Sequence, residues 1–175
     1  MDWCHYRFRT VWDLAAGPDR VYHALAHPEE YSRWWPQIRE VTLLDEHTGT
    51  ARFRSLLPYD LVVTAHARLR DPAVRVLEAE MTGDLDGWVR WTLTARGAGT
   101  RVLYEQEVDV RKPLMRRLAL PARPVFLANH ALMMRSGRRG LAAHLKAARP
   151  HDGASPDGVR GSVLEEQRSG DGRAV

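Results

Sequence analysis

The feature that most constrains this chain is a segment with helical periodicity, from Pro113 to Ala148, that is long enough to span a whole domain. At about 100° per residue its apolar and small side chains gather on one face and its basic side chains on the other. The apolar face carries Phe126, His130, Met133, Met134, Gly137, Gly140, Leu141, His144 and Ala148. The opposite face carries Arg135, Arg138, Arg139, Lys146 and Arg149. The pattern predicts an amphipathic helix that buries one side.

The buried side of this predicted helix is unusual in its residue types. It holds two methionines, two glycines and two histidines where a plain core helix would carry branched aliphatic residues. Methionine is flexible and polarisable, so such a face suits a variable ligand. An ordinary core helix remains the alternative interpretation.

A run of predicted strands precedes this helix. The strands lie near 3–14, 38–45, 49–57, 60–70, 74–82, 87–96 and 101–110. Short turn sequences separate them, and connections this short force neighbouring strands to be antiparallel. Two short helices, over 20–26 and 29–35, fill the gap after the first strand. We expect a wedge there, because a parallel crossover needs a longer helix.

Alternation along the strands predicts which side chains face inward. The inward set is Phe53, Ser55, Leu57, Leu61, Val63, Ala65, Ala67, Leu69, Val89, Trp91, Leu93, Val102, Tyr104, Gln106 and Val108. The first strand adds Tyr6, Phe8, Thr10 and Trp12. The strand that holds Glu78 and Glu80 does not alternate cleanly, so the pattern leaves its facing open.

Length and composition indicate one globular domain with an appendage. Of the 175 residues, 44% are hydrophobic and 27% are charged. We expect a domain over 1–149 and a polar tail over 150–175, which has too few large apolar residues to offset its ordering entropy. No apolar run approaches the roughly 18 residues of a membrane span, and the start lacks the apolar core of a secretory signal. With a single cysteine, these features predict a cytoplasmic protein without a transmembrane segment.

Charge is divided unevenly along the chain. Residues 1–110 hold 13 Lys or Arg and 17 Asp or Glu, a net charge of −4, whereas residues 111–149 hold 10 Lys or Arg and no acid, a net charge of +10. A basic final helix over an acidic sheet has three interpretations: internal complementarity, a docking face for anionic lipid or nucleic acid, or solubility. We do not expect nucleic acid as a partner.

One motif in the second short helix points to a known family. Residues Tyr31 to Pro36 read Y-S-R-W-W-P, which is similar to the Y-x-x-W-x-P signature of the START-like superfamily (SRPBCC, Bet v 1-like). The order of elements resembles the same superfamily, which includes plant pathogenesis-related allergens and bacterial proteins of the polyketide cyclase or dehydrase type. The resemblance implies an α+β helix-grip fold: a seven-stranded curved antiparallel sheet, two short helices after the first strand and a long C-terminal helix that closes an internal cavity.

The resemblance also implies a function. Members of the superfamily bind hydrophobic molecules of lipid, polyketide or aromatic type in the cavity. We therefore expect hydrophobic ligand binding, with a polyketide cyclase or aromatase that performs aldol cyclisation and dehydration as the alternative. A partner-binding module that uses the basic helix is a second alternative. No cofactor is implied, and a homodimer stays open.

The candidate site residues follow from the inward faces. We expect ligand contacts from Trp35, Phe53, Leu57, Tyr59, Trp91, Tyr104, Gln106, Phe126, His130, Met133, Met134 and Gly137. His130 and Tyr104 are the weak catalytic candidates, as a base and a hydrogen-bond donor; a structural histidine is the alternative. Trp34 and Trp35 either gate the entrance or anchor the wedge. The histidine spacing predicts no metal site.

Overall fold

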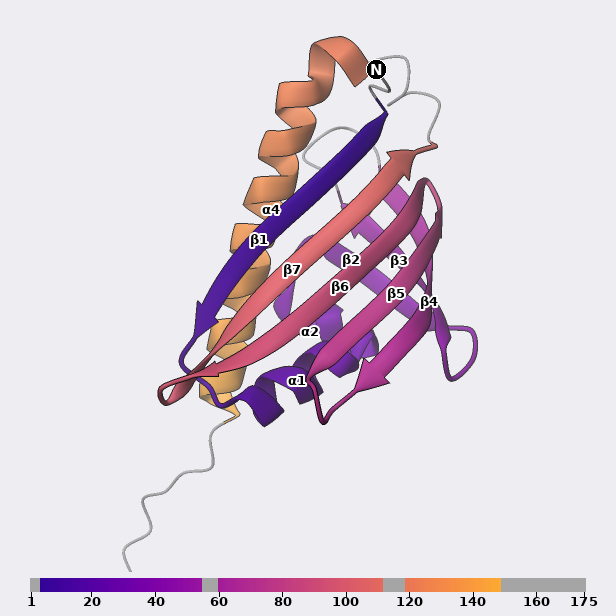
Figure 1. Ribbon diagram of the computed structural model, residues 1–175. Helices are drawn as coiled ribbons and strands as arrows, with labels where there is room; N and C mark the ends of the chain where they lie inside the picture. The colour runs from indigo at the N-terminus through magenta and orange to yellow at the C-terminus, as the bar shows by residue number, and fades with distance from the viewer. Residues whose placement is uncertain (1–3, 55–59, 112–118, 149–175) are drawn as a thin grey trace, which may run out of the picture.

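A curved antiparallel sheet wrapped along one long helix forms the core of the computed structural model (Figure 1). The structure describes residues 4–54, 60–111 and 119–148, with the backbone alone for residues 119–122. The elements are β1 (His5–Leu14), α1 (Pro18–Ala26), η1 (Pro28–Glu30), α2 (Tyr31–Trp34), β2 (Ile38–Leu43), β3 (Thr48–Arg54), β4 (Asp60–Asp71), β5 (Val76–Gly83), β6 (Leu85–Arg96), β7 (Gly99–Val110) and α4 (Ala119–Ala147).

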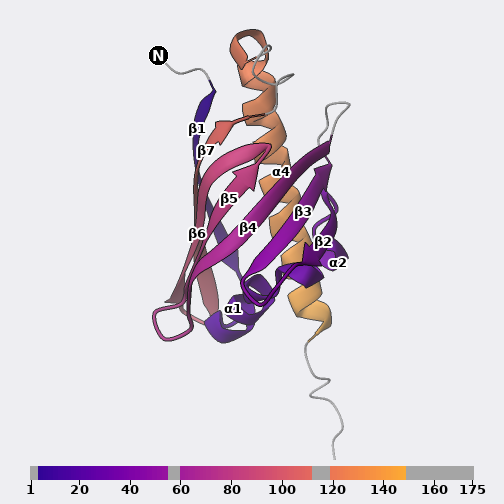
Figure 2. The same ribbon diagram turned by 90° about the vertical axis from the view of Figure 1, so that its right-hand side faces the viewer.

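The sheet has seven strands in the order β1-β7-β6-β5-β4-β3-β2, and every neighbouring pair is antiparallel. Strands β2 to β7 follow one another through short connections, whereas the helices after β1 carry the chain to the far edge. Figure 2 shows the sheet curled, with α4 running along its concave side. The helix-grip architecture expected from the sequence is confirmed.

The wedge after β1 forms from local sequence signals. Pro18 occupies the first turn of α1, where its missing N–H is harmless, and Gly17 is the N-cap. Pro28 then starts the short 3₁₀-helix η1, so the second predicted helix is η1 followed by a single α-helical turn. The Tyr31 hydroxyl donates to the Leu25 carbonyl oxygen at 2.6 Å and ties the two parts of the wedge together.

Helix α4 packs directly on the wedge through its two glycines. A Cβ at Gly137 would lie 2.5 Å from Cε2 of Trp35, and one at Gly140 would overlap the carbonyl oxygen of Trp34. The Trp35 indole Nε1 also donates to the Met133 carbonyl oxygen at 3.0 Å. The glycines therefore allow close packing of α4 on the wedge, whereas close approach to the sheet or to a ligand was the expectation from the sequence.

The predicted buried face of α4 is correct over most of its length. Met134 and Leu141 are almost fully buried, and the described basic side chains of the opposite face, Arg135, Arg138, Arg139 and Lys146, are exposed. The last turn differs, because Leu145 is buried there and Ala148 is exposed. Ala148 lies one residue beyond the end of α4, which ends at Ala147.

Ion pairs settle the facing of β5. Glu78 pairs with Arg90 and Glu80 pairs with Arg68, all on the convex side of the sheet. Leu77 and Met81 on the same strand are buried on the concave side. The concave side of the sheet and α4 therefore enclose the interior in which the candidate site lies.

Candidate functional site

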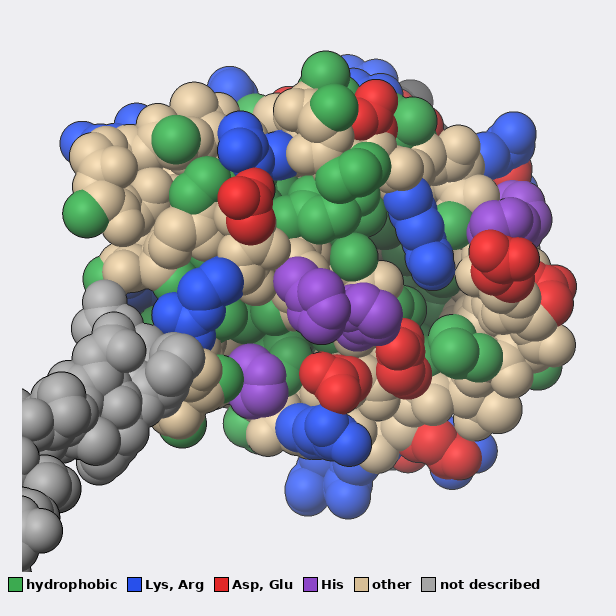
Figure 3. Space-filling model, turned by 90° about the horizontal axis from the view of Figure 1, so that it is seen from below, with side chains coloured by type: hydrophobic (Ala, Val, Ile, Leu, Met, Phe, Trp, Pro, Cys, Tyr) green, Lys and Arg blue, Asp and Glu red, His purple; other side chains and the backbone are tan. Residues whose placement is uncertain are grey.

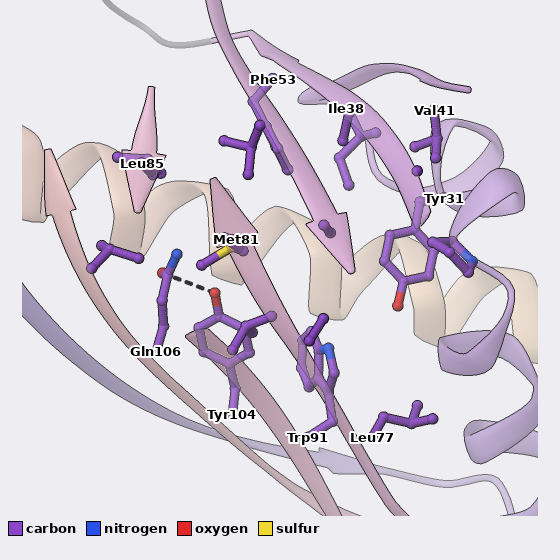
Figure 4. Close-up of a pocket in the computed structure, with 18 of the residues that line it drawn as sticks. Tyr31, Ile38, Val41, Phe53, Leu77, Met81, Leu85, Trp91, Tyr104 and Gln106 are labelled. Carbon is purple, nitrogen blue, oxygen red and sulfur yellow. Dashed lines mark hydrogen bonds between the residues drawn. The ribbon is translucent and has the colours of Figure 1, made fainter. Parts of the chain in front are cut away.

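A cavity of about 260 Å³ lies between the concave side of the sheet and α4. Its walls are mostly apolar, and the close-up in Figure 4 shows the inward side chains of several strands converging on it. The described lining includes Phe8, Tyr31, Trp35, Ile38, Val41, Phe53, Val63, Leu77, Met81, Leu85, Val89, Trp91, Tyr104, Gln106, Phe126, His130 and Met133. The volume is just below the range of drug-sized pockets, about 300–1,000 Å³. The space therefore suits a small hydrophobic molecule.

One end of the cavity lies beside the wedge, at the bottom of Figure 1. The lining there includes Ala26 and Pro28 from the wedge, Leu43 and Thr48 from the two sides of the β2–β3 turn, and Arg70 from the end of β4. Figure 3 views the molecule from this end and shows hydrophobic side chains inside a hollow, with histidine and charged side chains around it. This end is the mouth of the cavity.

Three polar side chains form a hydrogen-bonded group in the cavity wall. The Tyr104 hydroxyl lies 2.9 Å from Gln106 Oε1, and His130 Nε2 lies 3.2 Å from the same oxygen. A carbonyl oxygen only accepts hydrogen bonds, so both partners donate and His130 carries its proton on Nε2. Tyr104 and Gln106 are two residues apart on β7 and therefore share the concave face. We call Tyr104, Gln106 and His130 the polar triad.

Aromatic packing fixes the orientation of the triad. The His130 ring stacks on Phe8 with a centroid distance of 3.6 Å, and the Tyr104 ring packs against Trp91 at 4.5 Å. Both contacts hold rings whose polar atoms point toward Gln106. The triad is thus set in an apolar wall, which strengthens its hydrogen bonds because water does not compete.

Burial tunes the triad toward neutral hydrogen bonding. It lowers the pKa of His130 to about 4, and it raises the pKa of the Tyr104 hydroxyl far above its ordinary value. Both groups are therefore uncharged at pH 7. A neutral His130 protonated on Nε2 leaves its Nδ1 as a lone-pair acceptor. Among the described residues, no partner is within hydrogen-bond distance of this Nδ1 or of the Gln106 amide nitrogen.

A β-bulge at the end of β4 changes which side chains face the cavity. Ala67 pairs with Ala79 but Leu69 pairs with Glu78, so Arg68 is one extra residue on β4. Strict alternation along β4 predicts that Leu69 faces inward and that Arg68 faces outward. After the bulge Leu69 and Arg70 both border the cavity and both are exposed, Leu69 by 41%, and Arg70 lies opposite the buried Leu77.

The structure brings together most of the predicted site residues. Those that line the cavity are Trp35, Phe53, Trp91, Tyr104, Gln106, Phe126, His130 and Met133. Met134 and Gly137 do not line it, because Met134 is packed in the core and Gly137 lies under the Trp35 indole. Leu57 and Tyr59 lie outside the described residues. The ligand-binding role of the set stays a prediction.

Both tryptophans of the motif are buried. Trp34 is 5% exposed and belongs to the hydrophobic core, which agrees with an anchoring role. Trp35 is 4% exposed, lines the cavity and is fixed by its hydrogen bond to α4.

Several lining residues were absent from the predicted site. Tyr31, Ile38 and Val41 come from the wedge and β2, and the curl of the sheet alone brings them over the cavity. Leu77 and Met81 belong to β5, whose irregular alternation hid its facing; their apolar character in a strand with two outward glutamates was the available signal. Arg70 carried no signal, because the bulge that turns it inward has no marker in the sequence.

Within the described ranges, no three His, Cys, Asp or Glu side chains are grouped so that they could hold a metal ion. No helix in the same part of the chain is both long and apolar enough to cross a membrane.

The family of the chain follows from a match over nearly the whole described fold. The model of a family described as polyketide cyclase / dehydrase and lipid transport matches residues 5–148. The chain belongs to this family. The family comprises cyclase and lipid-transport proteins, so membership supports a ligand-binding or cyclase role. A comparison with curated proteins found no match.

Solved structures of the same fold agree with this assignment. The Zhui aromatase/cyclase from a Streptomyces species superposes with a TM-score of 0.64 at 16% identity, covering 81% of this chain and 94% of that one. A START superfamily protein from Mycobacterium smegmatis superposes with a TM-score of 0.63 at 13% identity, covering 81% of this chain and 97% of that one. A Thermus thermophilus protein superposes with a TM-score of 0.67 at 16% identity, covering 83% of this chain and 100% of that one. At such identities the likeness concerns the fold.

Proposed function

We propose that this member of the polyketide cyclase / dehydrase and lipid transport family binds a small hydrophobic molecule in the cavity between the sheet and α4. The observation that carries the proposal is an apolar cavity of about 260 Å³ with one polar triad in its wall. Apolar walls supply affinity through surface removed from water. A few placed polar groups orient the ligand.

The triad can recognise one polar group of such a ligand. The Gln106 amide nitrogen donates, and the free lone pair of His130 accepts. Figure 4 shows that the hydrogen bond from the Tyr104 hydroxyl ends on the amide oxygen of Gln106, so the amide nitrogen takes no part in it. A ligand carbonyl or hydroxyl placed beside the triad would satisfy groups that otherwise lack a partner in the described part of the protein.

The protonation states favour binding over catalysis. A general base works best with a pKa near the working pH, and that of His130 is about 4. Neutral Tyr104 donates its hydrogen bond within the triad and not to an enolate oxygen. The alternative function, cyclisation and dehydration of a polyketide, is favoured by the convergence of three polar side chains inside the cavity and by the fold shared with the Streptomyces aromatase/cyclase.

Native mass spectrometry of the purified protein tests the proposal. A co-purifying apolar molecule, identified after denaturing extraction, is the expected result. The second arm measures thermal shifts with lipids, sterols and polyketide-like aromatics. A protein that is empty and shows no shift with any of these probes would contradict hydrophobic binding.

A matched pair of variants locates the binding site. Met133 lines the cavity, whereas the neighbouring Leu132 is 51% exposed on the same helix. Met133→Trp should fill the cavity and lower ligand affinity at least tenfold, while Leu132→Trp should leave affinity unchanged. Equal affinities in the two variants would place binding elsewhere.

A further inference from the structure

The bulge in β4 places a cation at the mouth of a mostly apolar cavity, and one acid, Glu78, whose carboxylate pairs with Arg90, also borders the cavity. Residues that pair directly across an antiparallel sheet share one face. Arg70 pairs with Leu77, which pairs with Trp91. Leu77 and Trp91 are both buried against the cavity, so Arg70 belongs to the concave side. Among the described lining residues, it is the only lysine or arginine.

Arg70 forms no hydrogen bond or ion pair within the described part of the protein. Its neighbours in sequence contrast with it, since Arg68 pairs with Glu80 and Arg75 pairs with Asp19. Glu29 lies near enough for its charge to interact with that of Arg70, but it is held by His27 at 2.9 Å and stays outside ion-pair distance of Arg70. The guanidinium is therefore available to an anion at the mouth.

Arg70 and the polar triad mark opposite ends of the apolar space. The row of paired residues runs from Arg70 through Leu77 and Trp91 to Tyr104. Neighbouring strands lie about 4.8 Å apart, so Arg70 and Tyr104, which are three strands apart, are separated by roughly 14 Å along the sheet. Figure 4 shows Leu77 near Tyr31 at one end of the cavity and Gln106 at the other.

We infer that the cavity takes an amphiphilic carboxylic acid, with its carboxylate at Arg70 and its apolar chain directed toward the polar triad. The inference rests on the proposed function and names its ligand class. One guanidinium matches one carboxylate with two parallel hydrogen bonds, whereas a phosphate dianion calls for further cations that the described lining does not hold.

Calorimetric titration with decanoate and with decanol tests the inference, because the two probes share a chain and differ in charge. Wild-type protein should bind decanoate about five- to tenfold more tightly than decanol, the modest factor expected of an ion pair that stays partly in water. Arg70→Gln should abolish this preference by weakening the binding of decanoate more than that of decanol. Arg70→Lys should keep part of the preference.

Arg68→Gln is the matched control, because Arg68 lies two residues away on the convex side and pairs with Glu80. It should keep the full preference for decanoate. Equal binding of both probes by wild-type protein, or a preference that survives in Arg70→Gln, would overturn the carboxylate inference while hydrophobic binding stands. Binding of neither probe would instead count against the proposed function.

Discussion

At the scale of single residues, His130 shows how burial decides chemistry. Its ring is held between Phe8 and the Gln106 amide oxygen, and the low pKa follows from burial alone. Periodicity placed His130 on the inner face of the helix and predicted a base or a ligand contact. The degree of burial, which turns the imidazole into a neutral hydrogen-bonding group, depends on the aromatic rings packed around it.

The pKa of His130 predicts a pH dependence of stability. The folded pKa is about 4 against an ordinary value of 6.5, so the unfolded chain binds more protons between these values. The contribution of His130 is fully present above about pH 6.5 and is lost as the pH falls toward 4. The loss amounts to about 3 kcal/mol in the free energy of unfolding.

Urea denaturation of wild-type protein and of His130→Gln at neutral pH and near pH 4.5 measures this contribution. The stability of wild-type protein should fall more steeply with acid than that of the variant. His144→Gln, on the same helix but outside the cavity lining, should behave like wild type. Parallel curves for His130→Gln and wild type would show that His130 does not couple folding to protons.

At the scale of elements, the contact of α4 with the wedge rests on two glycines. Glycine costs about 1 kcal/mol relative to alanine inside a helix, so its presence needs a reason. The reason is proximity: the helix backbone approaches Trp34 and Trp35 too closely for a Cβ. The sequence showed the glycines, and only the packing of the two helical elements identified their neighbour.

Gly140→Ala should therefore destabilise the protein although alanine favours helix. The new Cβ would overlap the Trp34 carbonyl oxygen, a backbone atom that cannot rotate away. We expect a net loss of about 2 kcal/mol, since overpacking commonly costs 1–3 kcal/mol or more.

Chemical denaturation of wild-type protein, Gly140→Ala and Gly17→Ala measures the three free energies of unfolding, and Gly17→Ala is the control. At Gly17 an added Cβ meets no atom within 4 Å, so Gly17→Ala should lose only the N-cap preference for glycine, about 0.5–1 kcal/mol, and less than Gly140→Ala loses. If Gly140→Ala proved as stable as wild type, the close approach of α4 to the wedge would be wrong.

At the scale of the whole molecule, charge is arranged differently on the sheet and on α4. Many arginines of the convex sheet face acids on neighbouring strands, as in the pairs Arg7–Glu107 and Arg101–Asp13. The exposed Arg135, Arg138 and Arg139 of α4 have no acidic partner among the described residues. Internal complementarity, one of the three interpretations of the basic helix, receives no support from these side chains.

The basic face of α4 should be independent of the cavity. A double variant, Arg135→Glu with Arg139→Glu, changes only exposed side chains that do not line the cavity. Its affinity for a neutral apolar probe such as decanol should stay within about twofold of wild type, because screened surface charges act weakly across a domain.

Titration calorimetry with decanol, paired with sedimentation of the protein with anionic vesicles, measures both properties. Vesicle binding that is present in wild type, salt-sensitive and lost in the double variant would assign a docking role to this face. A large loss of decanol affinity in the double variant would contradict the separation of the two surfaces.

The sequence by itself determined the order of elements, the antiparallel sheet, the buried face of α4 and about half of the described cavity lining. It did so because alternation and helical periodicity record which side of each element avoids water. Tertiary structure alone decided the inward turn of Arg70, the glycine contacts with the wedge and the meeting of Gln106 with His130. These depend on one extra residue in β4 and on distances between packed elements, and no local pattern of residue types encodes either.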